Sequence, residues 1–164
     1  MTFVVLSDTH GRADRVASVL SRNTQRDAVL FLGDCLRDVM DVSDAISVKG
    51  NCDGLLFGGE SEQMLCFDGV RILMMHGHTH SVKSGTDRAV LYALSKGADV
   101  LLYGHTHLPE EKYYPAGSNI SGTLTDKPIY VFNPGCLGAP NDTHPSFGLL
   151  QIKNGSVLLS HGKL

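Results

Sequence analysis

The stretch Val4-Val5-Leu6-Ser7-Asp8-Thr9-His10-Gly11 decides how the rest of the chain is interpreted. Residues 3–6 are continuously apolar, which is typical of a strand buried on both faces of an α/β sheet. Ligand sites in such sheets lie at the carboxyl ends of strands, where Asp8 and His10 follow. Because side chains alternate along a strand, these two residues point the same way. Alone, Asp-x-His is more often a capped turn than a ligand pair, so the interpretation depends on what recurs downstream.

Composition indicates one ordinary globular domain over residues 1–164, because 42% of the residues are hydrophobic and only 6 are prolines. The formal net charge of −3 gives no basic footprint for nucleic acid. We find no signal-peptide pattern and no apolar run long enough for a membrane span. We therefore expect a cytoplasmic protein whose four cysteines, which show no CxxC spacing, are reduced thiols.

Strand and helix patterns alternate through the first half of the chain. Apolar residues fall at helical spacing over 13–20, buried strands are predicted at 28–32 and 45–48, and a weak helix at 36–40. This alternation predicts parallel strands joined by right-handed crossovers. A glycine-rich loop at 55–59 precedes a hairpin of residues 63–67 and 70–75, whose turn is Asp68-Gly69.

The second half continues the same alternation. A helix is predicted at 87–96 with Gly97 as its C-cap, followed by a buried strand at 100–103. Strands at 112–116 and 128–132 are joined by a polar excursion through Asn119. Residues 147–153 and 157–160 form a terminal hairpin around Asn154-Gly155.

Five strand ends are each followed by side chains able to bind a metal: Asp8 and His10, Asp34, Asn51, His76, and His105 with His107. One ion needs about four ligands, so seven candidates indicate two ions that share a bridge, and Asp34, alone at its strand end, is the expected bridge. Nitrogen and oxygen donors without thiolate suit manganese, iron, zinc or cobalt better than calcium. Two ions roughly 3.5–4 Å apart would clamp the attacking and leaving oxygens of a phosphoryl displacement.

In this order, the motifs Asp-x-His, Gly-Asp, Gly-Asn-Cys-Asp, His-Gly-His and Gly-His-Thr-His resemble those of the calcineurin-like metallophosphoesterases. The chain length and Asn133-Pro134-Gly135 resemble the small stand-alone bacterial and archaeal phosphodiesterase branch. The resemblance implies an α/β fold, a four-layer αββα sandwich of two packed mixed β-sheets flanked by helices. It also implies two divalent ions, manganese first, with nickel, cobalt, iron and zinc as alternatives. One ion would be held by Asp8, His10, Asp34 and His107, and the other by Asp34, Asn51, His76 and His105.

The activity implied by the resemblance is a dinuclear metal-dependent phosphodiesterase that acts on a small diester through attack of a metal-bridging hydroxide. Two divalent ions, two carboxylates and one hydroxide leave about +1 at the centre, which matches a diester monoanion better than a monoester dianion. The alternatives are a phosphomonoesterase or nucleotide phosphatase, and a non-catalytic protein-interaction scaffold similar to the retromer small subunit. No membrane or nucleic-acid partner is indicated, and a homo-oligomer is left open.

The catalytic candidates lie at the strand ends after residues 48 and 75: Asn51, Cys52, Asp53 and His78. Cys52 stands where many superfamily members carry a histidine that protonates the leaving group. An unperturbed thiol has a pKa of about 8.5, so it could donate a proton near neutrality. His78 is the second candidate, as an acid or a phosphate contact. Asp53 either orients a metal ligand or stabilises the turn.

The remaining histidines and cysteines are expected to have no role in the site. His80 is expected to be an exposed loop residue, and His144 and His161 are expected at the surface. Asn133 is expected to hold the rim of the site as a turn residue, with substrate contact as the alternative. Small packing roles are expected for Cys35, Cys66 and Cys136.

Overall fold

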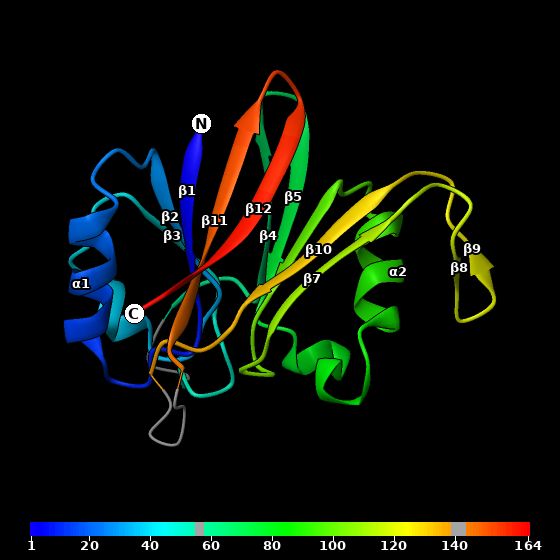
Figure 1. Ribbon diagram of the computed structural model, residues 1–164. Coiled ribbons are helices and arrows are strands. Elements are labelled where there is room, and N and C mark those ends of the chain that lie inside the picture. The colour runs from blue at the N-terminus through cyan, green and yellow to red at the C-terminus, as the bar shows by residue number, and fades with distance from the viewer. Residues whose placement is uncertain (55–57, 139–143) are drawn as a thin grey trace.

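The computed structural model describes residues 1–54, 58–138 and 144–164, so most of the glycine-rich loop predicted at 55–59 lies outside the described residues. Two five-stranded sheets pack face to face, and helices cover their outer faces (Figure 1). Both sheets mix parallel and antiparallel pairs. The predicted four-layer α/β sandwich is therefore confirmed.

The first sheet contains the N-terminal strands. Its strands lie in the order β12 (Ser156–Lys163), β11 (Ser146–Lys153), β1 (Thr2–Leu6), β2 (Ala28–Phe31) and β3 (Ala45–Ser47). β1, β2 and β3 pair in parallel, as their alternation with helices predicts. The terminal hairpin of β11 and β12 extends the sheet antiparallel to β1, and β12 runs three residues beyond the predicted end at residue 160.

The second sheet contains the middle of the chain. Its order is β4 (Glu62–Phe67), β5 (Val70–Met75), β6 (Val100–Tyr103), β10 (Ile129–Pro134) and β7 (Pro109–Tyr114). β5, β6 and β10 are parallel, and the edge strands β4 and β7 are antiparallel to their neighbours. Strand β7 lies earlier in the chain than the predicted strand at 112–116. The polar excursion contains a small hairpin of β8 (Asn119–Ile120) and β9 (Thr123–Leu124) that the sequence did not indicate.

Two α-helices cover the sandwich on opposite sides, α1 (Ala13–Arg22) on the first sheet and α2 (Asp87–Ser95) on the second (Figure 1). The predicted C-cap is confirmed, since Gly97 has φ +75° and its N–H donates to Leu94 O at 2.8 Å. Short 3₁₀ helices make up the remaining helical structure of residues 1–54, 58–138 and 144–164: η1 (Leu36–Val39), η2 (His78–His80) and η3 (Val82–Ser84). Among the described residues, no helix has the length and apolar character to cross a membrane.

Strand β1 shows why the run at residues 3–6 is apolar without alternation. Phe3 and Val5 face the core between the two sheets, whereas Val4 and Leu6 face α1. All four side chains are fully buried. The run therefore packs on both faces and fixes β1 in the centre of its sheet, so the polar residues that follow are delivered to the rim.

A close approach at Gly50 joins two of the loops at this rim. A Cβ at Gly50 would overlap Asp34 Oδ1 and crowd the Asp34 backbone nitrogen. We expect Gly50→Ala to lower the free energy of unfolding by about 1–3 kcal/mol, because the Asp34 loop would have to shift. Denaturant unfolding should be compared with Gly58→Ala, whose added methyl group meets open space. Equal stability of the two variants would contradict the close approach.

Candidate metal centre

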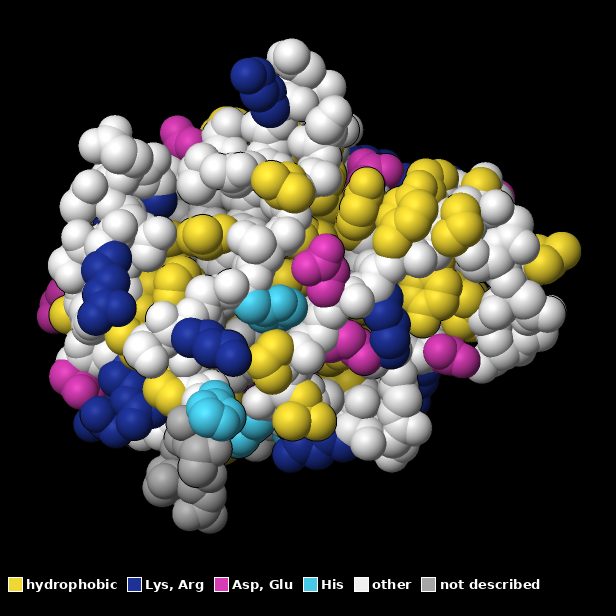
Figure 2. Space-filling view, in the orientation of Figure 1, with side chains coloured by type: hydrophobic (Ala, Val, Ile, Leu, Met, Phe, Trp, Pro, Cys, Tyr) yellow, Lys and Arg dark blue, Asp and Glu magenta, His cyan; other side chains and the backbone are white. Residues whose placement is uncertain are grey.

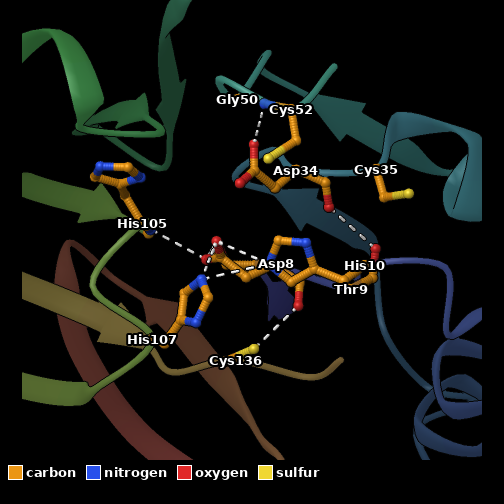
Figure 3. Close-up of polar contacts among 12 residues, drawn as sticks. Asp8, Thr9, His10, Asp34, Cys35, Gly50, Cys52, His105, His107 and Cys136 are labelled. Carbon is orange, nitrogen blue, oxygen red and sulfur yellow. Dashed lines mark hydrogen bonds and ion pairs between the residues drawn. The ribbon is translucent and has the colours of Figure 1, made fainter. Parts of the chain in front are cut away.

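The side chains predicted as metal ligands converge where the carboxyl ends of the two sheets meet. The first sheet supplies residues that follow β1, β2 and β3: Asp8, His10, Asp34 and Asn51. The second sheet supplies residues that follow β5 and β6: His76, His105 and His107. In Figure 3, Asp8 lies in the middle of the group, with imidazoles from both sheets around it.

Asp8 is fully buried, and its two carboxylate oxygens have different surroundings. Oδ2 accepts hydrogen bonds from Ser7 Oγ at 2.5 Å and from the His105 backbone N–H at 3.0 Å. Oδ1 has no hydrogen-bond donor among the described residues. Three imidazole Nε2 atoms surround Oδ1 at 3.1–3.9 Å, those of His107, His10 and His76. A buried carboxylate oxygen without a donor is costly unless a cation binds it, so this arrangement fits a metal ion.

His10 and His107 form the side of the centre nearest solvent. Their Nε2 atoms are 3.3 Å apart, and their side chains are 25% and 34% exposed. A neutral imidazole presents one lone pair, so two such nitrogens at this distance need a proton or a cation between them. Figure 2 shows histidine side chains at the surface in the lower half of this face, with Lys and Arg side chains beside them. The partial exposure of His10 and His107 leaves this side of the centre open to solvent.

His76 is fully buried and held in a single orientation. Its Nδ1 lies 2.8 Å from Leu32 O, and a carbonyl can only accept, so Nδ1 carries the proton. Its Nε2 faces Asp34 Oδ2 at 3.4 Å and Asn51 Oδ1 at 3.2 Å. A nitrogen lone pair among these oxygens is stable only with a proton or a cation between them, which again fits a metal ion.

Asp34 lies between two groups of donors. One donor atom from each of Asp34, His76 and His105 forms a group within 4.8 Å, and Asp34 forms a second such group with His10 and Cys52. The Cys52 backbone N–H donates to Asp34 Oδ1 at 2.8 Å, which holds the carboxylate in place. Asp34 therefore occupies the position that a bridging ligand would require.

The carboxylates and imidazoles of the centre shift one another's pKa values. Burial raises the pKa of Asp8 and of Asp34, but neighbouring imidazoles lower both below their ordinary range, His107 and then His76 for Asp8, and His76 for Asp34. For His76, burial lowers the pKa, but the two carboxylates raise it above the usual value. Burial and the positive charge of His76 lower the pKa of His105 to about 4. His105 is thus neutral at physiological pH, with a lone pair available to a metal.

Tight turns of the backbone aim the donors inward. Five of the seven predicted ligands have a left-handed backbone with φ between 45° and 69°: Asp8, His10, Asp34, His105 and His107. Such conformations cost about 1–3 kcal/mol each in residues other than glycine and cluster at functional sites. Their concentration at this rim indicates that the turns serve the site.

The two candidates for general acid both lie beside the donors. Burial and the Asp34 carboxylate raise the pKa of Cys52 to about 11, so its thiol keeps its proton at neutral pH. His78 is half-buried, and its Nδ1 has no hydrogen-bond partner among the described residues. Together with Lys49 and Asn51, His78 lines a cavity of about 620 Å³. The cavity is a candidate space for a substrate.

The Asp53 carboxylate is bonded to the backbone of two neighbouring loops. Asp53 is 3% exposed, and its carboxylate accepts four backbone N–H bonds at 2.7–3.0 Å, from Asp34, Cys35, Leu36 and Gly50. These donors use its available lone pairs. Both roles considered from the sequence are compatible with this geometry: the bonds stabilise the turn, and the bond from the Asp34 N–H holds the loop that carries a predicted metal ligand.

Several expectations for the other histidines need correction. His80 is half-buried, with its ring 4.6 Å from that of Tyr92, and is not an exposed loop residue. His144 is exposed, as expected. His161 is half-buried, and its Nε2 lies 2.7 Å from Asn133 O, so the expected surface position was wrong. Asn133 holds the rim, because its Nδ2 donates to Gly104 O at 3.1 Å.

The cysteines also differ from one another. All four are free thiols. Cys66 is exposed on β4, so its expected packing role was wrong, and Cys35 is partly buried. Cys136 is buried, but its sulfur donates to Asp8 O at 3.1 Å, which places it beside the centre. The turn Asn133-Pro134-Gly135-Cys136 was expected at the rim, but the contact of the Cys136 sulfur with Asp8 O was not expected from the sequence.

Comparison with known proteins identifies the family. Residues 1–155 match the model of the calcineurin-like phosphoesterase superfamily domain. A probable metallophosphoesterase of Mycoplasma pneumoniae is 34% identical over 94% of this chain and 91% of its own. Phosphodiesterase YfcE of Escherichia coli is 28% identical over 92% of this chain and 87% of its own. Vps29 of Entamoeba histolytica, solved in complex with zinc, is 25% identical with a TM-score of 0.71 and covers 99% of both chains. The chain therefore belongs to the calcineurin-like phosphoesterase superfamily.

Proposed function

We propose that this chain is a dinuclear metal-dependent phosphodiesterase. The observation that carries the proposal is Asp8 Oδ1, a buried carboxylate oxygen without a donor that faces three imidazole nitrogens. Two bound divalent ions would supply the positive charge that polarises the phosphate and activates water for in-line attack. The similarity to a protein named phosphodiesterase supports the diester chemistry.

The residues of the chain prepare the site for these ions. Asp8, His10, Asp34 and His107 would hold one ion, and Asp34, Asn51, His76 and His105 the other. Nitrogen and oxygen donors of this kind suit manganese, the ion we expect first, and also nickel, cobalt, iron or zinc. Ser7 and Leu32 fix the orientation of Asp8 and His76, so that Asp8 Oδ1 and His76 Nε2 face the position of an ion.

The cavity beside Asn51 suits a small diester. Its volume of about 620 Å³ accommodates a small molecule, and Lys49 and His78 offer positive or hydrogen-bonding groups to a phosphate. Either Cys52 or His78 would protonate the departing alkoxide. The free thiols of the chain support a reducing, cytoplasmic location.

The similarity to Vps29 makes a non-catalytic protein-interaction role the second candidate. The two candidates differ in what they require of the rim. A scaffold needs no metal-binding side chains there, whereas all seven predicted positions in this chain carry one. The complete set of donors favours the enzyme.

The first test concerns the bridging position. Asp34→Asn should lose both ions and essentially all diesterase activity, because no other carboxylate among the described residues belongs to both donor groups. Metal content by mass spectrometry and hydrolysis of an aryl diester are the measurements. The exposed Asp41→Asn is the matched control and should behave like the parent. Two bound ions and full activity in Asp34→Asn would refute the assignment.

The second test separates the histidines that follow β5. His76→Ala should lose one ion, because it removes the nitrogen between Asp34 and Asn51. His80→Ala should bind metal like the parent, since His80 packs on Tyr92 outside the centre. The measurement is the metal-to-protein ratio of each variant after dialysis. Loss of metal in His80→Ala alone would mean that the wrong histidine has been chosen.

The third test asks which group is the acid. Removing a proton donor should harm poor leaving groups most, by about 10²–10⁴-fold, and activated aryl leaving groups least. We expect Cys52→Ala to lose activity disproportionately on alkyl diesters and Cys52→His to restore it. The measurement is kcat/KM for diesters of graded leaving-group pKa in the three proteins. Parallel plots for the parent and Cys52→Ala would move the assignment to His78 or to solvent.

A further inference from the structure

A second cleft lies between η3 and the loop that joins β6 to β7 (Figure 1). Its volume is about 460 Å³, and Lys83, Thr86 and Glu110 are among the residues that line it. No described residue of its wall also lines the cavity at Asn51 and His78. The cleft is therefore a space distinct from the cavity considered above.

The wall of this cleft is built on the loops that carry the histidines of the second sheet. Thr106 stands between His105 and His107 in the chain and lines the cleft. Val82, also in the wall, packs on Gly77 in the loop after β5, because an added Cβ at Gly77 would lie 2.8 Å from Val82 Cγ2. The Val82 N–H also donates to Gly77 O at 3.4 Å. The cleft therefore adjoins the proposed metal centre.

The start of α2 presents unpaired hydrogen-bond donors at this cleft. The Val90 N–H donates to Thr86 O at 3.0 Å, which is the first bond of the helix. The backbone N–H groups of Asp87, Arg88 and Ala89 donate to none of the described residues. Such groups point back along the helix axis, toward the residue before the helix, and they attract anions. Since that residue, Thr86, lines the cleft, the donors point toward the end of the helix that borders it.

The hydroxyl of Thr86 is a further donor without a partner. Thr86 is 8% exposed, yet its side chain neither caps α2 nor makes another hydrogen bond among the described residues. The fully enclosed side-chain atoms that lack a partner are Asp8 Oδ1 and His78 Nδ1, so the Thr86 hydroxyl reaches accessible space. A largely buried hydroxyl without a partner is costly unless a solvent molecule or a ligand meets it. An acceptor in the cleft would satisfy this hydroxyl and the helix N–H groups together.

The charged side chains of the cleft leave one positive charge without compensation. Two lysines and one glutamate line it: Lys83, Lys112 and Glu110. Lys112 Nζ lies 2.6 Å from Glu110 Oε1, so these two charges compensate each other. Lys83 is exposed and forms no ion pair with a described residue. Asp87, the acid at the start of α2, does not line the cleft and already accepts a hydrogen bond from Ser121 Oγ at 2.5 Å.

The two spaces beside the centre suit different parts of a diester. The acid candidates Cys52 and His78 lie at the cavity next to Asn51, so the alcohol that departs with a proton belongs there. A diester carries one other alcohol, which stays on phosphorus and must extend elsewhere. The cleft adjoins the centre through Thr106 and shares no described residue with that cavity, so it suits the alcohol that stays.

We propose that this cleft binds an anionic group, a phosphate or a carboxylate, on the alcohol that remains esterified to phosphorus. This inference rests on the proposed phosphodiesterase function. Hydrolysis adds the hydroxyl of water to phosphorus and a proton to the departing alcohol, so the anionic alcohol stays on the monoester product. The Thr86 hydroxyl, the N–H groups at the start of α2 and the Lys83 ammonium would donate to the anion, and hydrogen bonds to a charged group are the strong ones.

The experiment uses manganese-loaded full chain and p-nitrophenyl diesters that share one leaving group. Their second alcohol is propyl, 2-carboxyethyl or 2-phosphoethyl, which carry no anion, a carboxylate and a phosphate. At least one anionic diester should have a kcat/KM about 10–100-fold above that of the propyl diester, the effect of a hydrogen bond to a charged group, chiefly through a lower KM. The diester with the larger ratio identifies the anion. Values for both anionic diesters that do not exceed the propyl value refute the proposal.

Variants are compared by the ratio of kcat/KM for the preferred anionic diester to that for the propyl diester. Loss of fold or of metal affects both diesters alike, so it leaves this ratio unchanged. Thr86→Val, which removes no charge, should lower the ratio about tenfold, and Thr86→Ser should keep it. Lys83→Gln should also lower it. Lys153→Gln, at an exposed position near the end of β1 away from the rim, is the matched control and should keep the parent ratio. A parent ratio in Thr86→Val overturns the proposal.

Amide NMR of the zinc-loaded parent gives a second measurement that does not depend on turnover. The ligands are ethanediol bisphosphate and 3-phosphooxypropanoate, the monoester products of the two anionic diesters, and propyl phosphate is the reference. At least one anionic product should shift the amide signals of residues 85–89 beyond the shifts that propyl phosphate causes, and equal shifts refute the proposal. Hydrolysis without preference for an anion overturns this inference alone. Failure to hydrolyse any of the diesters overturns the proposed function as well, so the two failures are distinguishable.

Discussion

The burial of the Asp8 carboxylate where the two sheets meet is the constraint on which the rest of the structure depends. A charge removed from water must be compensated, and here the compensation is divided between the two oxygens. Oδ2 is satisfied by Ser7 from its own strand and by the His105 N–H from the other sheet. Because His105 belongs to the second sheet, Asp8 is satisfied only in one relative position of the sheets. The same relative position of the two sheets places the imidazoles of His10, His76 and His107 around Asp8 Oδ1.

The loops at this rim combine strained turns with strong local support. Asp34 and Cys35 adopt left-handed conformations in succession, with φ of 65° and 87°. Asp53 offsets this strain, since its carboxylate binds the backbone N–H groups of both residues and of Gly50. Asp53 thus joins the loops after β2 and β3, and Asp34 is held rigidly although it is part of a turn. A rigidly held ligand is pre-organised for an ion, and such pre-organisation is what backbone strain at a functional site can provide.

The strands, and the convergence of the seven candidate donors at one rim, could be predicted because their signals are local. Asp34 and His76 follow apolar runs within one to three residues, and parallel strands bring such ends to one edge. Contacts between distant residues could not be predicted in this way. His161 meets Asn133 across 28 residues, and no periodicity links them. The β8–β9 hairpin was missed because strands of two residues are too short to show an alternating pattern.

The division of the donors between the two sheets has a consequence for how the chain folds in a cell. During synthesis Asp8, His10 and Asp34 emerge before His76, His105 and His107, so an incomplete chain lacks three of the seven predicted donors. Ion capture would have to wait until the second sheet docks, and the free energy of binding would then hold the sheets together. The folding equilibrium would then depend on the concentration of the available ion. Scarcity of the ion would then reduce the amount of folded protein, and the loss would be seen in abundance as well as in turnover.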